Sequence, residues 1–336
     1  MAGRELAFSD PEVIRLASER FVPIAENVSI LQWVQDAEGE YFRLVAEQGH
    51  YAGRTFPTST RQGYYAFTPD GTLLAARNSR DPRQMEDMML TALRRWSVLT
   101  DCDGQALTPA VLPDFTPALP SRYPEGGLVL QLATRDLPRE VDTRRDDWRK
   151  QAWNLDYAWI TRDEARSLVP ASLAPGARQQ APWEVVRRLA RFHLRDFVRG
   201  EPPSWPVEAI RQAEVESVVQ GVSGDRQQLV RLSLSGSVRL QWEWRWMDRY
   251  RDEERTSEAG LKLDLSGEAT WDKEQERFVV FDLLAAGPRW GASQHNNRGD
   301  DLGPAPLAIA FVLAGNEPRD RTPPHTVTQR GYFNGG

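Results

Sequence analysis

The stretch Val230–Trp246, with the sequence VRLSLSGSVRLQWEWRW, decides the fold of the second half of the chain. Its even positions carry apolar residues or glycine and its odd positions carry polar residues, without a break over seventeen residues. This period of two is that of a β-strand with one buried face. At about 3.3 Å per residue the segment would extend roughly 55 Å, so we expect it to bend or break near Gly236.

Neighbouring segments predict the rest of an antiparallel sheet. A charged turn at 248–258 separates the first strand from a second alternating run, and residues 182–199 predict the main helix of this half. A sheet with one apolar face needs a packed helix, its own curvature or a ligand to exclude water from that face. Further strands are predicted at residues 127–132, 261–271, 278–286 and 307–313.

The first hundred residues follow a different pattern. Asp10-Pro11 predicts a helix start, Phe21–Ile24 a short buried strand, and residues 36–48 a second helix. Residues 63–75 enclose Thr68-Pro69-Asp70-Gly71, a sequence that closes hairpins, and Asp81-Pro82 starts another helix. The predicted order is therefore helix, strand, helix, hairpin, helix.

A proline-rich stretch separates the two halves. Five prolines lie between Thr108 and Glu125, which is typical of an extended linker. We predict an α+β protein in which a small α/β domain precedes a curved antiparallel sheet domain with a packed helix. The expected parts are a domain over 1–105, a linker over 106–125, the sheet domain over 126–316 and a flexible tail over 317–336.

Four segments follow one another in the first domain: Ser9–Ile14, Phe21–Ile24, Gly63–Gly71 and the helix from Pro82. Together they resemble the latter part of a thioredoxin-like domain. Three segments of the second half, Phe192–Asp196, Arg199–Pro203 and Phe281–Gly291, are similar to segments of bacterial thioredoxin family proteins of unknown role. This resemblance implies a partial thioredoxin-like fold without an established reaction.

The chain lacks the residues that give this family its redox chemistry. Thioredoxins need a Cys-x-x-Cys pair at a helix N-terminus, and this chain has one cysteine, Cys102, between two acidic residues. Gln62 stands where the family has its cis-proline before the hairpin. We therefore expect a redox-inactive domain, in which Cys102 is a bystander.

Composition excludes several classes of function. A net charge of -6 disfavours nucleic acid as a partner, and no stretch approaches the roughly 20 apolar residues of a membrane span. Without a secretory signal pattern we expect a cytoplasmic protein. The single cysteine excludes an internal disulfide and a cysteine-built zinc site, and no motif indicates a cofactor. Only three of the 42 basic residues are lysines, a skew that we ascribe to coding bias rather than to function.

Tryptophans are the first candidate binding residues. Trp242, Trp244 and Trp246 share one face of the predicted strand, and Trp271 and Trp290 could lie near them. Such a set can line a cavity for a small apolar ligand, although core packing of the sheet accounts for the same pattern.

The loop Gln294–Asp301 is the second candidate. His295, Asn297 and Arg298 could form a polar rim for a ligand, and the Asp300 and Asp301 carboxylates suit calcium or magnesium. A solvated connection with turn-capping aspartates is the alternative. His193 lies on the apolar side of its predicted helix and is expected to be a packed core histidine.

These observations favour a non-catalytic binding or interaction protein, whose partner is a small apolar ligand or another protein. The alternatives are a hydrolase or lyase that uses His295 with Asp300 or Asp301, with or without a metal, and a redox accessory that receives its thiols from a partner. The sequence assigns no catalytic residue and identifies neither the ligand nor the oligomeric state.

Overall fold

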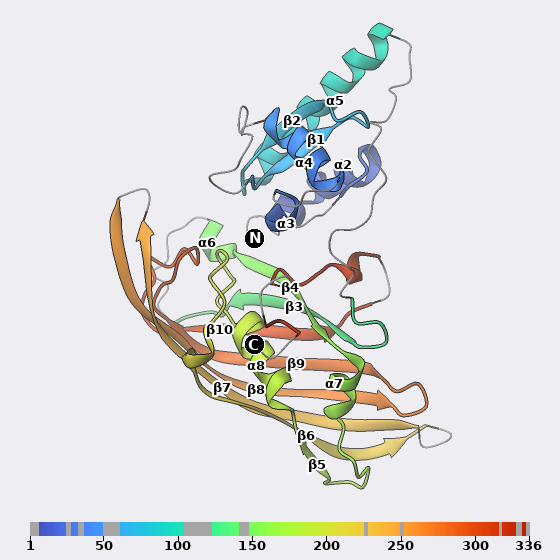
Figure 1. The fold of residues 1–336 in the computed structure, drawn as a ribbon, viewed down its shortest axis with the longest axis vertical. Coiled ribbons are helices and arrows are strands. Elements are labelled where there is room, and N and C mark those ends of the chain that lie inside the picture. The colour runs from blue at the N-terminus through green and yellow to red at the C-terminus, as the bar shows by residue number, and fades with distance from the viewer. Residues whose placement is uncertain are drawn as a thin grey trace. The chain divides into compact units, whose positions relative to one another are not determined.

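The computed structural model contains two compact units, a smaller one within Gly3–Arg122 and a larger one comprising Tyr123–Gly336 (Figure 1). Most of the predicted linker and part of the predicted tail lie outside the described residues. The structure describes residues 7–24, 28–32, 37–49, 61–103, 123–140, 148–224, 228–248, 252–315, 318–326 and 331–333.

The smaller unit consists of helices and a two-stranded antiparallel hairpin. Asp10 accepts hydrogen bonds from the backbone N–H groups of Glu12 and Val13, at 2.9 and 3.2 Å, and caps the first helix as the sequence predicted. Gly71, with a φ of 85°, allows the predicted hairpin turn. The elements are α2 (Pro11–Arg20), α3 (Val28–Leu31), α4 (Ala37–Glu47), β1 (Tyr64–Phe67), β2 (Leu73–Arg77) and α5 (Pro82–Asp103).

The prediction of a buried strand at Phe21–Ile24 is wrong. These residues have no strand pairing, and Val22 and Ile24 are 88% and 68% exposed. A run of four apolar residues does not specify a strand by itself, and Pro23 removes one of its ladder donors. The resemblance to a thioredoxin-like domain includes a strand at this segment. The described residues show a helix and hairpin unit but no thioredoxin-like sheet. Cys102 falls in the last turn of α5, and its side chain lies outside what the structure describes.

The larger unit is an eight-stranded antiparallel sheet, in the order β4-β3-β10-β9-β8-β7-β6-β5, with short helices beside it (Figure 1). Its strands are β3 (Leu128–Asp136), β4 (Trp153–Ile160), β5 (Arg178–Gln180), β6 (Ile210–Ser223), β7 (Leu229–Asp248), β8 (Glu253–Asp272), β9 (Arg277–Trp290) and β10 (Ala305–Leu313). Its helices are α6 (Trp148–Gln151), α7 (Arg162–Ser167), α8 (Trp183–Arg188), the π-helix η1 (Leu189–His193), and the 3₁₀ helices η2 (Val207–Ala209) and η3 (Pro318–Arg321).

The predicted alternation in β7 is confirmed, but the strand is longer and more regular than expected. β7 pairs with β8 over their full twenty residues without a shift in register. Gly236 does not break the strand; a Cβ there would overlap the Glu214 carbonyl oxygen of β6, so glycine serves close strand approach. The charged turn is also shorter than predicted, because pairing continues to Asp248 and Glu253.

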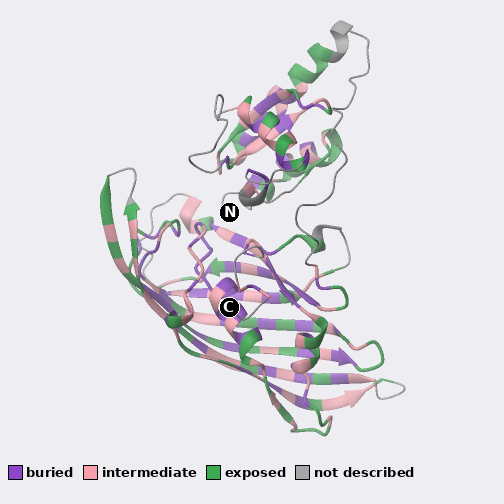
Figure 2. Ribbon diagram, viewed as in Figure 1, coloured by how far each residue is buried: buried purple, intermediate pink, exposed green. Residues whose placement is uncertain are grey.

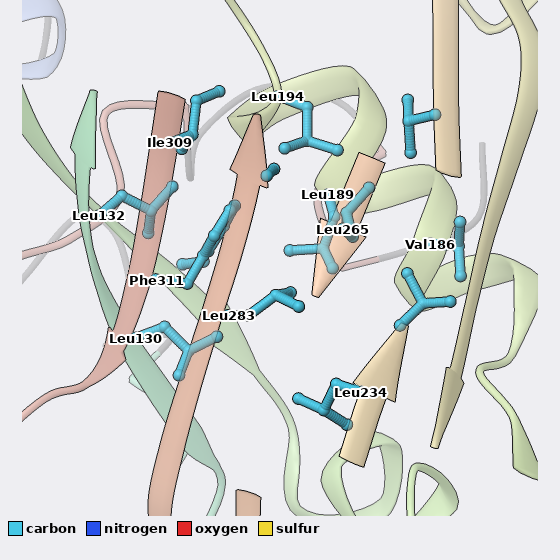
Figure 3. Packing of buried hydrophobic residues seen from close by; sticks show 14 of the residues in the cluster. Leu130, Leu132, Val186, Leu189, Leu194, Leu234, Leu265, Leu283, Ile309 and Phe311 are labelled. Carbon is cyan, nitrogen blue, oxygen red and sulfur yellow. The ribbon is translucent and has the colours of Figure 1, made fainter. Parts of the chain in front are cut away.

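The apolar face of the sheet is covered by the protein's own helix. Buried and exposed positions alternate along the strands (Figure 2). Val186 and Leu189, from α8 and η1, belong to the same buried cluster as Leu265, Leu283 and Phe311 of the sheet (Figure 3). The apolar cavity left beneath this cover has a volume of about 20 Å³. This space admits about one water molecule, so the chain fills its own core.

Two further predictions need adjustment. The helix expected over 182–199 ends as α8 and η1 at His193, where the Leu194 N–H bonds back to the Leu189 carbonyl in π geometry. The tail is not loose throughout, since Tyr332 is 1% exposed and packs on Phe192 at a ring distance of 5.4 Å. Among the helices that the structure describes, none is long and apolar enough to cross a membrane.

Candidate functional site

β7 and β8 continue past their neighbours as a two-stranded ribbon, formed by Trp242–Asp248 and Glu253–Ala259 (Figure 1). β6 begins at Ile210, opposite Leu240, and β9 ends opposite Gly260. Within the described residues, the two strands of the ribbon therefore pair only with each other. Their outer edges carry backbone N–H and C=O groups that no neighbouring strand uses.

The two faces of the ribbon differ in chemistry. Trp242, Trp244 and Trp246 share one face and are partly buried; the first two pack against the core cluster, and Trp246 does not. On the other face the exposed Arg245 and Glu243 form an ion pair, with Arg245 Nη2 and Nε 2.6 and 3.0 Å from Glu243 Oε1. Met247, also on that face, is 51% exposed. The ribbon therefore presents large apolar side chains on both faces.

A tryptophan notch lies at the base of the ribbon. Trp244 contacts Trp205 at a ring distance of 5.5 Å, and Trp290 lines the same notch. The Trp205 indole donates to the Leu194 carbonyl at 3.1 Å, whereas the buried Trp244 Nε1 has no acceptor among the described residues. The remaining lining residues are Asp196, Pro202, Pro203, Ala259, Gly260, Leu261, Ser293 and Asn296.

The chain's own proline pair forms part of the wall of this notch. Pro202 and Pro203 line it together with the tryptophans, and the cavity that remains has a volume of about 10 Å³. One water molecule just fits such a space and could accept the Trp244 indole N–H. A small apolar ligand therefore has no preformed cavity here.

Glycine at position 260 allows the strands and an indole to meet. A Cβ on Gly260 would overlap the Trp290 ring and the Leu240 carbonyl oxygen. Trp290 consequently lies against the β8 backbone, where the ribbon leaves the sheet. This close contact fixes the direction in which the ribbon projects.

Buried arginines and aspartates form the floor below the notch. Arg298 is fully buried and makes bidentate pairs with Asp136, at 2.8 and 2.7 Å, and with Asp196, at 2.7 Å for both bonds. Asp136 ends β3, Asp196 follows η1, and Arg298 comes from the loop between β9 and β10. One guanidinium therefore ties together three segments that are distant in sequence.

Asp301 is the second centre of this arginine–aspartate cluster. Its carboxylate accepts from Arg139 at 2.7 and 2.9 Å, from Arg199 at 2.8 Å, from Arg298 at 3.1 Å and from Arg289. Burial would raise the pKa of Asp301, but the Arg139 hydrogen bonds and the charges of Arg289 and Arg298 lower it to about 2. An acid of this strength, already surrounded by cations, cannot act as a general acid or base near pH 7.

The same environment acts on the arginines. Burial, reinforced by the charge of Arg298, lowers the pKa of Arg199 to about 10. Burial alone would lower the pKa of Arg298. The charges and hydrogen bonds of Asp196 and Asp136 have the larger, opposite effect, so the pKa of Arg298 lies above its usual value. Both arginines remain cations near pH 7, so the cluster is a network of ion pairs.

The rest of the predicted polar loop is fixed by backbone contacts. His295 and Asn297 adopt positive φ values of 70° and 54°. The His295 carbonyl accepts from Glu201 N–H at 3.0 Å, and Asn297 Nδ2 donates to the Arg199 carbonyl at 2.8 Å. A Cβ on Gly200 would overlap the His295 carbonyl oxygen, so the loop lies directly on this glycine. The His295 side chain is exposed.

His193 is a buried structural residue, as the sequence predicted. Its Nε2 lies 2.9 Å from the Tyr332 hydroxyl, which also accepts from the Trp159 N–H at 3.0 Å. Its Nδ1 lies 3.7 Å from Asp156 Oδ2. Burial lowers the pKa of His193, and the neutral ring is favoured. With no exposed surface, His193 fastens the C-terminal segment to β4 and η1.

The structure brings together only part of the predicted site. Trp244 and Trp290 share the notch, and Trp242 and Trp246 continue along the ribbon. Trp271 lies near the opposite end of β8, where its ring contacts Phe278 at 5.0 Å. Asp300 faces Arg199 and Arg149, at 3.4 and 3.6 Å. Among the described residues no group of three or more histidine, cysteine or acidic side chains could hold a metal ion, so the metal site stays a prediction.

Sequence reasoning missed Trp205, Asp196 and the proline pair. The signal was present in Glu201–Pro206, because two prolines beside a tryptophan, between a helix and a tryptophan-rich strand, are suited to packing against indole rings. Asp196 carried no signal, since its partner Arg298 lies 102 residues away.

No protein-family model, curated protein or solved structure matches the chain. The site must therefore be interpreted from its own geometry.

Proposed function

We propose that the chain is a non-catalytic interaction protein, and that its contact surface is the ribbon with its tryptophan face and its strand edges. One observation carries this proposal: β7 and β8 project past both neighbouring strands while bearing the half-buried Trp246 and the exposed Met247. Large apolar side chains on a projecting element favour a contact surface, and a strand edge beside which no strand pairs can accept a further strand.

The base of the ribbon supports the proposal, because it is rigid. Trp244 packs on Trp205 and lines the notch together with the proline pair, and Arg298 of the arginine–aspartate cluster holds Asp196, which lines the same notch. A rigid base spares part of the ordering cost that binding would otherwise impose on a projecting element. The ribbon side chains next to this base therefore keep the same positions before and after binding.

Chemistry at the predicted polar loop has less support. The Asp301 carboxylate already accepts hydrogen bonds from several arginines. The His295 carbonyl and the Asn297 side chain of the loop already bond to the backbone of Glu201 and Arg199. The notch leaves a volume of only about 10 Å³ for a small apolar ligand. Binding along the ribbon needs no such cavity.

A displayed library of random peptides tests the function. We expect extended peptides to be enriched on the native protein and to quench its tryptophan fluorescence. Trp246→Ala should abolish their binding, whereas Trp183→Ala, which removes an indole that is 48% exposed on α8, should not. Failure to enrich any peptide, or equal loss with both variants, would refute the proposal.

The redox-inactive, thioredoxin-like interpretation of the smaller unit is part of the same proposal. It is supported by the single cysteine, which cannot form the dithiol that thioredoxin chemistry needs. We expect no turnover in a disulfide-reduction assay with insulin, and Cys102→Ser should leave the result unchanged. Turnover that Cys102→Ser removes would overturn this interpretation.

A further inference from the structure

In the described residues no further strand pairs with the outer edge of β7 in the ribbon. Sheet edges are commonly protected by shortness, by charged side chains and above all lysine, by proline, by a bulge or by a cover. From Gln241 to Asp248 β7 has neither lysine nor proline, its ladder with β8 shows no irregularity, and its charged residues Glu243 and Arg245 pair with each other. A long and regular edge of this kind is a template for pairing with another strand.

The two outermost strands of the sheet are protected. At one end β5 has only three residues. At the other end the Tyr332 hydroxyl takes up the backbone N–H of Trp159 in β4, and Asp156 of the same strand accepts from the His325 N–H at 2.9 Å. The chain thus closes the two outermost strands, whereas in the part that the structure describes the ribbon edge pairs with no further strand. This contrast indicates that pairing at the ribbon has a use.

The sequence of this edge is complementary to itself. Residues 242–246 read Trp-Glu-Trp-Arg-Trp, a palindrome in which one charge is reversed. In an antiparallel pair of two such strands, with a twofold axis at Trp244, Glu243 of each copy lies opposite Arg245 of the other. On the other face Trp244 meets Trp244, and Trp242 meets Trp246. Opposite charges and aromatic pairs in these positions stabilise a sheet.

The charges also select this register. If the axis moves to Glu243, the two Glu243 side chains face each other, and if it moves to Arg245, the two arginines do. Like charges directly opposite each other destabilise a strand pair. The ribbon therefore carries a repulsive element against both neighbouring registers, which is how specific interfaces exclude wrong pairings.

We propose that the partner of the ribbon is a second copy of this chain, bound through antiparallel pairing of the two β7 edges about Trp244. The dimer contains a continuous sheet in the order β8-β7-β7-β8 across the axis. This inference rests on the proposed function, since it uses the ribbon as the contact surface, and it names the partner.

Sedimentation velocity of the whole chain, from about 1 to about 200 μM, tests the dimer. We expect a reversible monomer–dimer equilibrium. Arg245→Glu should raise the dissociation constant at least about tenfold, because carboxylates then face carboxylates, and Glu243→Arg should do the same with guanidinium groups. Glu243 and Arg245 are exposed, with side-chain exposures of 55% and 68%, so these variants leave the fold intact.

Mixing separates pairing from misfolding. The two single variants have complementary edges, so an equimolar mixture should form a heterodimer, which native mass spectrometry distinguishes from both homodimers. The double variant E243R/R245E should dimerise like the native chain. Arg239→Glu changes an exposed arginine of β7 that lies between β6 and β8, and should have no effect.

A native chain that stays monomeric over this range, or a dimer that ignores both single charge reversals, overturns the inference. Peptide binding that Trp246→Ala abolishes in such a monomer would leave the proposed function intact and exclude only the second copy as partner. Absence of both activities would refute both proposals. A mixture without heterodimer would reject the charge register.

Discussion

Arg298 is the single residue whose loss should cost the larger unit most. Arg298→Met keeps much of the aliphatic packing but leaves the buried Asp136 and Asp196 carboxylates without their bidentate partner. We expect the free energy of unfolding to fall by about 3–5 kcal/mol, as is usual when one member of a buried ion pair is removed. Urea unfolding followed by tryptophan fluorescence measures this change.

Arg162→Met is the matched control for that variant. Arg162 pairs with Glu276 at 2.6 Å, but its side chain is 58% exposed, so removing it should cost less than about 1 kcal/mol. An Arg298→Met loss no larger than the control would mean that Asp136 and Asp196 find other partners.

The buried His193 should make stability depend on pH. Burial lowers the pKa of His193 in the folded protein, so the unfolded chain, with a histidine pKa near 6.5, binds more protons. Stability is therefore complete above about pH 6.5 and falls as the pH decreases below it, by up to about 1.4 kcal/mol per pH unit.

His193→Gln, which can still bond to the Tyr332 hydroxyl, should flatten this dependence. Urea unfolding at pH 7, 6 and 5 compares the two slopes. Asp156 lies beside the His193 ring. Burial would raise the pKa of Asp156, but its hydrogen bonds, the one from His193 foremost, together with the neighbouring charges have the larger effect and lower this pKa, so Asp156 does not titrate between pH 5 and pH 7. Equal slopes in both proteins would show that His193 is not the titrating group.

At the scale of single residues, local chemistry was predictable and distant pairing was not. The Asp10 cap and the burial of His193 follow from neighbours within one helical turn. The partners of Arg298 do not, because Asp136 lies 162 residues away. In a chain with arginine at nearly every basic position, no count could single out this one.

At the scale of elements, Gly260 connects the ribbon to the sheet. Gly260→Ala places a methyl group against the Trp290 ring and the Leu240 carbonyl oxygen, and the backbone cannot yield easily. We expect a loss of about 1–3 kcal/mol and a red shift of the tryptophan emission as Trp290 is displaced. Calorimetry and fluorescence measure the two effects.

The control is Gly303→Ala, since a Cβ at Gly303 would meet no atom within 4 Å. This variant should keep the native melting temperature and emission. A Gly260→Ala protein that behaves like the control would mean that the ribbon is not fixed by this contact.

Strands were more predictable than the helix that covers them. Alternation over β7 reports burial directly, because one face meets the core along its whole length. The helix predicted over 182–199 was too long, because apolar residues continue past His193 although the helix ends there. Leu194, Phe197 and Val198 are buried in irregular backbone, where Arg195 donates to the Pro202 carbonyl at 2.6 Å. Apolar spacing cannot distinguish these two kinds of burial.

At the scale of the whole molecule, alternation in the sequence predicted a one-sided sheet but not what fills it. The notch is closed by Pro202 and Pro203, and its floor by ion pairs between β3, the segment after η1 and the loop before β10. These contacts join residues that are far apart in the sequence, so the sequence pattern does not reveal them. The sequence predicted five of the eight strands, β3, β7, β8, β9 and β10, and missed β4, β5 and β6. The role of the ribbon required knowing where β6 and β9 end.

Acid should destabilise the larger unit through the arginine–aspartate cluster. Arginine hydrogen bonds outweigh burial and lower the pKa of Asp301 to about 2, and Arg298 keeps the pKa of Asp136 below its usual value. An unfolded aspartate has a pKa near 3.9, so Asp301 contributes stability that is complete above about pH 4 and lost as the pH falls through about 2. For this residue alone the contribution is about 2–3 kcal/mol.

Tryptophan fluorescence follows this transition in the intact chain, because ten of its 12 tryptophans lie between Tyr123 and Gly336. Urea unfolding at pH 4, 3 and 2 should show a falling midpoint, and Asp301→Asn, less stable at pH 4, should lose less between pH 4 and pH 2. Because these pairs are buried, 0.5 M salt should change the result little at any of these pH values. A midpoint that stays constant between pH 4 and pH 2 would mean that the guanidinium groups do not hold the cluster together as ion pairs.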